Sequence, residues 1–318
     1  MATYKEIRGT QIEAVATDPS NPVEGQVWYN TTSNVLKGQA TTTAGSWATG
    51  GNLNTARAIQ GAAGTYNASL DYGGYTTTNV GVTETYNGTN WTEVNDMNTA
   101  RSAFAAGGIQ TSAIAAGGQG PPNGVTNCEI WNGTNWTETT DLNVSRRYIT
   151  GASDVNTAAI AFGGIPPNPG TGATELWNGS NWTEVNDLTT ARRSIAGCGS
   201  STAGFAVSGY DGETALECEI WNGTNWTEVN DIPSGYGIGA AFGTTTAAVV
   251  NGNTVTKEWN GTNWAEGTAS STNVSNRACS GTASLGIAAG GEPPPSGVAT
   301  TEEWTGPGTA QTRTFTDS

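Results

Sequence analysis

The sequence of 318 residues predicts an all-β fold built from repeated units. The segment from Trp131 to Glu138 recurs at 86–93, 177–184, 221–228 and 259–266, and Trp304 opens a degenerate sixth copy. Successive copies lie 45, 46, 44, 38 and 45 residues apart, which fits a four-stranded propeller blade better than the shorter repeat types. Short runs of small residues alternate with glycine-containing turns in every unit, as is typical of strands. We therefore expect a β-propeller of four-stranded blades.

Each unit opens with an arginine, except that Tyr236 takes this place in one unit. Two runs of small residues follow, and the second often ends in a glycine pair such as Gly117-Gly118. Small side chains suit strands near a central axis, where larger ones would collide. A third strand then ends in an aromatic residue, and a fourth begins with tryptophan. The predicted units are 57–100, 101–145, 146–191, 192–235, 236–276 and 277–318.

The four residues Asn132 to Asn135 predict a hairpin turn, with glycine where a positive φ is tolerated. A loop of this length places Trp131 opposite Trp136, and such aromatic cross-strand pairs contribute roughly 0.2–1 kcal/mol. Bulky tryptophans belong on the outer strands, where blades splay apart. The residues expected to hold the repeat together are Arg101, Arg146, Arg192, Trp131, Trp136, Trp177, Trp182, Trp221, Trp226, Trp259 and Trp264.

The first fifty residues differ from the repeats. Ser46-Trp47, followed by Asn52 to Arg57, matches the passage from a fourth strand to the next arginine. Two strand-like pieces, 26–30 and 35–38, precede it, so we expect 26–56 to form a partial closing blade in a ring of seven. The alternative is a six-bladed ring with an external N-terminal hairpin. Residues 1–25 are interpreted as an attachment segment and 26–318 as the propeller.

Composition and charge exclude several classes of function. There are 12 Lys and Arg against 27 Asp and Glu, a net charge of −15, and no histidine. Without histidine, His-based triads and nearly all zinc, copper and non-haem iron sites are excluded. The acidic balance speaks against nucleic acid as a partner. No apolar stretch reaches the about 18 residues of a membrane helix. We expect no catalytic residue, no metal site, no cofactor and no membrane insertion.

The acids placed by the repeat have two interpretations. Glutamates of the fourth strand and aspartates of the loop after it recur in register: Glu93, Glu138, Glu184, Glu228, Glu266, Asp96, Asp141, Asp187 and Asp231. One interpretation is a ring of carboxylates that binds Ca²⁺. The other is structural, in which each acid pairs with the arginine of the next unit or caps backbone NH groups. We favour the structural interpretation, because a functional site breaks symmetry and this pattern keeps it.

The loops between the second and third strands differ in every unit. In a four-stranded meander they emerge on the same face as the connections between blades. Proline lowers the entropy cost of holding a loop in a binding shape, and loops on rigid scaffolds commonly carry function. The candidate contact residues are Tyr75, Pro121, Pro122, Pro166, Pro167, Tyr210, Asp211, Pro293, Pro294 and Pro295.

The glycine pair, the aromatic about a dozen residues later, the following tryptophan and the arginine of the next unit resemble the kelch repeat over residues 52–318. This resemblance implies a kelch-like β-propeller. Kelch-like propellers include the copper enzyme galactose oxidase, whose chemistry needs histidine ligands. The Ser-x-Asp-x-Gly-x-Thr-Trp box of sialidase propellers is also missing from this sequence. The sequence therefore favours a protein that is not an enzyme.

A second resemblance lies near the N-terminus. The segment from Asp18 to Thr32, followed by Leu36-Lys37, looks like a short hairpin module common in tailed-phage fibre and appendage proteins. Together with the Trp-Asn-Gly-Thr-Asn-Trp-Thr-Glu repeats, it resembles propeller-bearing proteins of marine phages. The resemblance implies a virion protein that assembles in the host cytoplasm. The segment Met1–Ala16 lacks the features of a signal peptide, which agrees with that expectation.

Three functions follow from these patterns. We favour a tail-fibre or appendage propeller that docks to other virion proteins through its N-terminal segment and presents loops to a host-surface glycan or outer-membrane protein. The alternative is an architectural capsid or tail decoration protein. A propeller glycosidase ranks third. The sequence leaves the receptor and homo-oligomerisation open.

Overall fold

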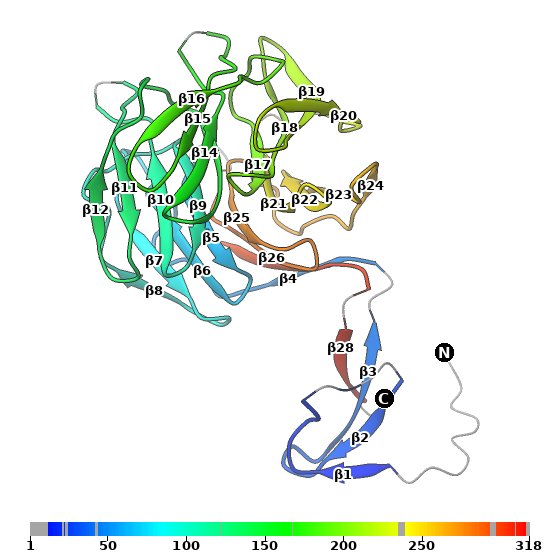
Figure 1. The fold of residues 1–318 in the computed structure, drawn as a ribbon. Helices are drawn as coiled ribbons and strands as arrows, with labels where there is room; N and C mark the ends of the chain where they lie inside the picture. The colour runs from blue at the N-terminus through cyan, green and yellow to red at the C-terminus, as the bar shows by residue number, and fades with distance from the viewer. Residues whose placement is uncertain are drawn as a thin grey trace. The chain divides into compact units, whose positions relative to one another are not determined.

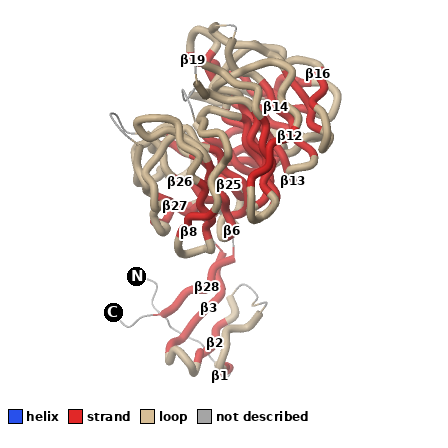
Figure 2. The backbone as a smooth tube through the Cα atoms, turned by 90° about the vertical axis from the view of Figure 1, so that its left-hand side faces the viewer, coloured by secondary structure: helices blue, strands red, loops and turns tan. Residues whose placement is uncertain are grey.

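The computed structural model describes residues 12–20, 22, 25–41, 44–121, 123–166, 168–234, 239–292, 297–308 and 310–315. Within this part of the chain all regular structure is β-strand (Figure 2). No described helix is long and apolar enough to cross a membrane. The strands form seven four-stranded sheets. The chain divides into a terminal unit, Met1–Gly45 with Gly306–Ser318, and a ring unit, Ser46–Thr305.

The first three sheets of the ring unit are antiparallel meanders, which we name blades 1 to 3. Blade 1 contains β5 (Gly61–Thr65), β6 (Ala68–Tyr72), β7 (Thr83–Tyr86) and β8 (Trp91–Val94). Blade 2 contains β9 (Ala105–Ile109), β10 (Ser112–Ala116), β11 (Cys128–Trp131) and β12 (Trp136–Thr139). Blade 3 contains β13 (Thr150–Val155), β14 (Ala158–Phe162), β15 (Thr174–Trp177) and β16 (Trp182–Val185).

Blades 4 to 6 have the same antiparallel order. Blade 4 contains β17 (Ala196–Gly199), β18 (Gly204–Tyr210), β19 (Thr214–Trp221) and β20 (Trp226–Val229). Blade 5 contains β21 (Ala240–Thr244), β22 (Ala247–Gly252), β23 (Val255–Trp259) and β24 (Trp264–Glu266). Blade 6 contains β25 (Ala278–Gly281), β26 (Leu285–Ala289), β27 (Thr301–Thr305) and, from the N-terminal side of the chain, β4 (Ser46–Thr49).

The six blades form a propeller-like ring. Their first strands contact one another in the cyclic order β5, β9, β13, β17, β21, β25 and back to β5. The fourth strands, among them β8, β12 and β20, lie at the rim (Figure 1). The expected ring of seven is therefore wrong, and the alternative of six blades matches the contacts. Likewise, the ring unit begins at Ser46 and ends at Thr305, whereas the sequence had suggested a propeller from 26 to 318.

The strand β4 explains why six blades suffice. The sixth repeat supplies three strands and the aromatic Trp304 but no second tryptophan. Trp47 on β4 takes this place, since Trp304 pairs with Trp47 as Trp131 pairs with Trp136 in blade 2. The match of Ser46-Trp47 to a fourth strand was thus a correct inference, but that strand completes the sixth blade instead of starting a seventh.

The seventh sheet belongs to the terminal unit. It contains β1 (Glu13–Val15), β2 (Val27–Asn30), β3 (Val35–Thr41) and β28 (Ala310–Phe315), and β1 runs parallel to β2. Asp18 accepts hydrogen bonds from Trp28 (2.9 Å), Asn30 (2.7 Å) and Lys37 (2.7 Å). These contacts, led by Lys37, lower the pKa of the Asp18 carboxyl to about 2. The segment that resembles the phage hairpin module therefore forms a hairpin with a loop bound to it.

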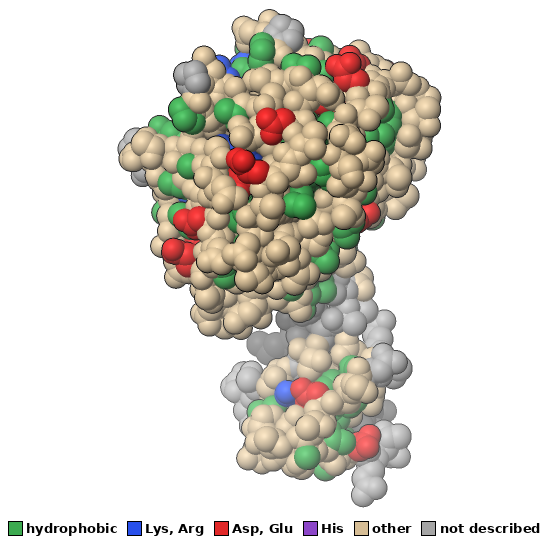
Figure 3. Space-filling model, turned by 60° about the vertical axis from the view of Figure 1, so that its left-hand side comes forward, with side chains coloured by type: hydrophobic (Ala, Val, Ile, Leu, Met, Phe, Trp, Pro, Cys, Tyr) green, Lys and Arg blue, Asp and Glu red, His purple; other side chains and the backbone are tan. Residues whose placement is uncertain are grey.

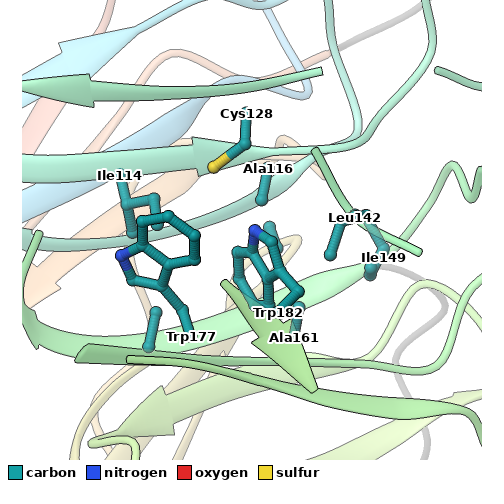
Figure 4. Packing of buried hydrophobic residues seen from close by; sticks show 10 residues of the cluster. Ile114, Ala116, Cys128, Leu142, Ile149, Ala161, Trp177 and Trp182 are labelled. Atoms are coloured by element: carbon teal, nitrogen blue, oxygen red, sulfur yellow. The ribbon is translucent and has the colours of Figure 1, made fainter. Parts of the chain in front are cut away.

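Tryptophans of the fourth strands join neighbouring blades. Trp136 Nε1 in blade 2 donates to Thr83 Oγ1 in blade 1 over 3.0 Å, and Trp226, Trp91 and Trp47 make the same bond to Thr174, Thr301 and Thr256. Between blades 2 and 3 the threonine is replaced by Cys128, which lies in one apolar cluster with Trp182 (Figure 4). Trp182 Nε1 has no hydrogen-bond partner within the described part of the chain. The cores thus lie between blades, where the repeat places its large residues.

Candidate functional site: the loop face of the ring

A buried ion pair supports the loops of five blades. In blade 2, Arg101 Nη1 donates to Glu129 Oε1 on β11 over 2.6 Å, and both side chains are fully buried. The equivalent pairs measure 2.5–2.7 Å and are Arg57–Glu84, Arg146–Glu175, Arg192–Glu219 and Arg277–Glu302. Removing one partner of such a pair costs about 3–5 kcal/mol, because it leaves a buried charge unpaired. The pairs therefore fix the backbone on which the loops stand.

The third-strand glutamate also binds the connection between blades. Glu129 accepts hydrogen bonds from the backbone of Asn98 (2.8 Å) and Thr99 (3.2 Å) and from the Asn98 side chain (2.9 Å). One carboxylate thus joins a loop, an arginine and a strand. Burial raises the pKa of the equivalent Glu302 carboxyl, but bonds from Ser271 and Arg277 outweigh burial and the pKa is lowered overall.

The fourth-strand glutamates do not pair with the arginines, which corrects the structural interpretation from sequence. They are exposed, namely Glu93, Glu138, Glu184, Glu228 and Glu266. The arginine partner comes instead from the third strand of the same unit. The loop aspartates do cap backbone groups as expected, since Asp96 and Asp187 accept bonds of 3.2 Å from the NH groups of Thr83 and Thr174.

Two blades depart from the common pattern. Blade 5 has Lys257 in place of the third-strand glutamate, and this buried lysine pairs with Glu266; Tyr236, at the arginine position, lies outside the described residues. In blade 6, Ser275 pairs with Glu292 after a glycine pair, as Ser102 pairs with Gln119 in blade 2. When Ser275 is aligned with Ser102, Arg277 lies three residues further along its blade than Arg101 does. Its guanidinium still donates to the equivalent glutamate, Glu302.

The variable loops and the connections between blades share one face, which we call the loop face. Backbone bridges tie the two sets together, as between Ala58 and Tyr75 and between Arg193 and Tyr210. Tyr75 is 40% exposed, Pro121 and Pro166 are exposed, and Tyr210 and Asp211 are partly exposed. The other expected contact residues lie outside the described part of the chain: Pro122, Pro167, Pro293, Pro294 and Pro295.

A central cavity of about 160 Å³ opens on the loop face. Its mouth is lined by residues with positive φ, Ile59 (58°), Ala103 (53°), Tyr148 (52°), Ser194 (53°) and Asn276 (54°). Non-glycine residues rarely adopt this conformation. It is held by backbone bonds between neighbouring blades, such as Ala103 N to Ile59 O and Ser194 N to Tyr148 O, each 3.0 Å. Backbone hydrogen bonds between neighbouring blades thus hold the residues that line the mouth.

On the face of the ring unit drawn in Figure 3, acidic side chains are scattered instead of gathering at one place. Within the described residues no group of three or more His, Cys, Asp or Glu side chains is placed to hold a metal ion. The Ca²⁺ interpretation of the acidic repeat therefore gains no support from the geometry.

Sequence reasoning missed two sets of residues. The first is the third-strand glutamates, represented by Glu129, whose regular place two residues before the first aromatic of each copy was visible in the sequence. The second is Arg147 and Arg193, each directly after a buried arginine. Their signal was the Arg-Arg doublet, which occurs in two units.

Comparison of this sequence with protein-family models and with curated proteins found no match.

Proposed function

We propose that this chain is a non-enzymatic virion protein of a tailed phage, in which a kelch-like ring presents its loop face to a host-surface glycan or outer-membrane protein. One observation carries the proposal: a regular, ion-paired scaffold supports loops that differ in every blade. Glu129 and its equivalents fix the connections between blades, while Tyr75 and Pro121 stand exposed beyond them. Such a division between constant frame and variable loops is typical of recognition proteins.

The terminal unit supports a role in attachment to the particle. The chain enters the ring unit at Ser46 and leaves it at Thr305, and these two residues pair with one another. On the terminal side, Thr41 pairs with Ala310. The chain therefore passes between the two units twice, and we propose that the terminal unit docks to other virion proteins. The attachment segment 1–25 lies partly outside the described residues.

The kelch-like assignment rests on the arrangement within each blade. The arginine, the glycine pair and the paired aromatics each have a structural task. Gly117 and Gly118 adopt φ values of 64° and 106°, and a side chain at Gly118 would lie 2.7 Å from the carbonyl oxygen of Ser102. Trp131 and Trp136 pack with ring centroids 5.5 Å apart.

A glycosidase role is disfavoured by how the carboxylates are used. Glycoside hydrolysis needs two carboxyl groups free to flank one sugar bond. The buried glutamates are each bound to an arginine and to groups of the connecting loop, as Glu175 is to Arg146 and Asn143. They are therefore committed to structure. The architectural decoration role is the second candidate, favoured by the regularity of the ring.

The proposal is tested by adsorption of the fluorescently labelled full chain to a panel of marine bacterial strains. We expect binding to at least one strain, and loss of binding when the loop 119–126 is replaced by a short Gly-Ser turn. The matched control is Thr134→Ser on the opposite face, which copies the Asn-Gly-Ser-Asn turn of blade 3 and should leave binding unchanged. No adsorption to any strain would contradict the attachment role and favour decoration.

A further inference from the structure

Two arginines of the ring unit are not used by the scaffold. Six of its eight described Lys and Arg side chains form ion pairs with carboxylates, as Arg101 does with Glu129. Within the described residues, Arg147 and Arg193 form no ion pair, and both are partly exposed on the loop face.

These arginines break the symmetry of the ring. Each follows the buried arginine of its blade and forms a backbone bridge near the end of the second strand, Arg147 with Ile165, three residues beyond β14, and Arg193 with Tyr210, the last residue of β18. The equivalent positions hold Ala58 in blade 1, Ser102 in blade 2 and Ser275 in blade 6. The cations are therefore confined to two adjacent blades and are not part of the repeat.

The fold brings the two positions together around one loop. Ser194 N, directly after Arg193, donates to Tyr148 O, directly after Arg147, over 3.0 Å. Arg147 and Ile165 exchange backbone bonds of 2.9 Å. From the other side, Arg193 Nη1 donates to Asn168 Oδ1 over 2.8 Å. The two arginines thus border the loop between β14 and β15, beside the mouth of the central cavity.

An aromatic ring stands next to each guanidinium. Arg193 Cζ lies 4.7 Å from the centroid of the Tyr210 ring, and Arg147 Cζ lies 5.9 Å from that of Tyr148. Tyr148 also lines the cavity mouth. The ring and Asn168 hold the Arg193 guanidinium in place, while one of its five N–H donors is used by the protein. Within the described residues, the other N–H donors of this guanidinium have no hydrogen-bond partner and are available to a ligand.

We propose that Arg147 and Arg193 bind carboxylates of an acidic saccharide at the rim of the central cavity, each guanidinium taking one carboxylate. Guanidinium groups present a planar fork that matches a carboxylate, and tyrosine rings can pack against the apolar face of a sugar. The acidic neighbours Asp211 and Glu213 and the net charge of −15 oppose ligands with many charges, so one carboxylate per sugar fits better than a polyphosphate. This inference rests on the proposed attachment function and names its ligand class.

The test titrates the full chain with a tetra-uronate oligosaccharide and, in parallel, with the same oligosaccharide after reduction of its carboxyl groups. We expect the uronate to bind at least tenfold more tightly than the reduced form. Arg147→Gln and Arg193→Gln should each weaken uronate binding about tenfold, the loss of one charged contact. Arg193→Lys keeps the charge but loses the fork and should recover only part of the affinity. Lys37→Gln removes the same charge from the terminal unit and should have no effect.

The outcomes separate this site from the attachment role. Equal binding of the reduced oligosaccharide, or full affinity in Arg147→Gln and Arg193→Gln, would overturn the site. If the chain adsorbs to cells but binds no uronate, the site is wrong while the attachment function stands. If the uronate binds in an arginine-dependent way but no cells are bound, the site is supported and the attachment function is contradicted. The comparison of the two oligosaccharides needs no variant, so it decides the question even if a substitution disturbs folding.

Discussion

The seam between blades 2 and 3 should become more stable when its cysteine is replaced by threonine. At four other seams a threonine hydroxyl accepts the indole N–H of the next blade. Thr83 and Thr174 also donate to a carbonyl two residues earlier, as Thr174 does to Gly172. Cys128 occupies this position opposite Trp182, whose Nε1 has no hydrogen-bond partner within the described residues. Sulfur is a weak acceptor, so Cys128→Thr should supply the missing bond.

The expected gain follows from that single bond. A neutral intramolecular hydrogen bond contributes about 0.5–1.5 kcal/mol net, and a buried donor left unpaired costs about 1–3 kcal/mol. We therefore expect Cys128→Thr to raise the free energy of unfolding by about 1 kcal/mol. The reverse change, Thr83→Cys, removes the acceptor of Trp136 and should lower it by about the same amount.

The measurement is urea unfolding of the full chain, monitored by tryptophan fluorescence. The dependence of the free energy of unfolding on urea concentration should be the same for all variants. Cys218→Thr is the matched control, because Trp264 at that seam already donates to the carbonyl oxygen of Asn230 over 3.1 Å. It should change stability by less than about 0.5 kcal/mol. The reasoning fails if Cys128→Thr and Cys218→Thr have equal effects, or if Thr83→Cys is neutral.

The remaining predictions concern buried ionisable groups. Glu129→Gln leaves Arg101 unpaired and should lower the free energy of unfolding by about 3–5 kcal/mol, whereas exposed Glu138→Gln should change it by less than about 0.5 kcal/mol; equal losses in urea unfolding would contradict the ion-pair account. Asp71 on β6 is fully buried and accepts hydrogen bonds from Arg57 Nε (3.0 Å) and Nη2 (2.6 Å). Burial outweighs this arginine and raises the pKa of the Asp71 carboxyl to about 6. The folded chain therefore binds this proton more tightly than the unfolded chain does. As the pH rises from about 4 to 6, deprotonation of Asp71 should lower the free energy of unfolding by about 3 kcal/mol. Asp71→Ala should remove that loss, and urea unfolding at several pH values would refute this if the pH dependence were unchanged. Burial also raises the pKa of the Cys198 thiol to about 12, so it should react with an alkylating reagent at about pH 8 only after unfolding; rapid labelling of its peptide in the native chain, measured by mass spectrometry, would contradict this.

Features set by local sequence were predictable. The Asn-Gly turn fixes the register of Trp131 and Trp136, because both partners lie within one hairpin. Small residues in the first strands follow from their place around the central cavity, which they line, whereas the second strands also carry large residues such as Phe162 and Phe205. These features need no knowledge of distant contacts, and the structure confirms them.

Features that depend on distant partners were not predictable from local pattern. Arg101 and Glu129 are separated by 28 positions, and several acids compete for each arginine. The fourth strand of blade 6 comes from the other end of the chain, so counting strand-like pieces in order gave one blade too many. The position of Arg147 and Arg193 beside the same loop could likewise be known only from the fold, although the Arg-Arg doublets are visible in the sequence.

Imaging the intact particle with this chain located in it tests the display function most directly. We predict that the terminal unit contacts other virion proteins, while the loop face with Tyr75, Arg147 and Arg193 is free of virion contacts. A particle in which the loop face is covered by neighbouring virion subunits would contradict the attachment role and establish decoration in its place.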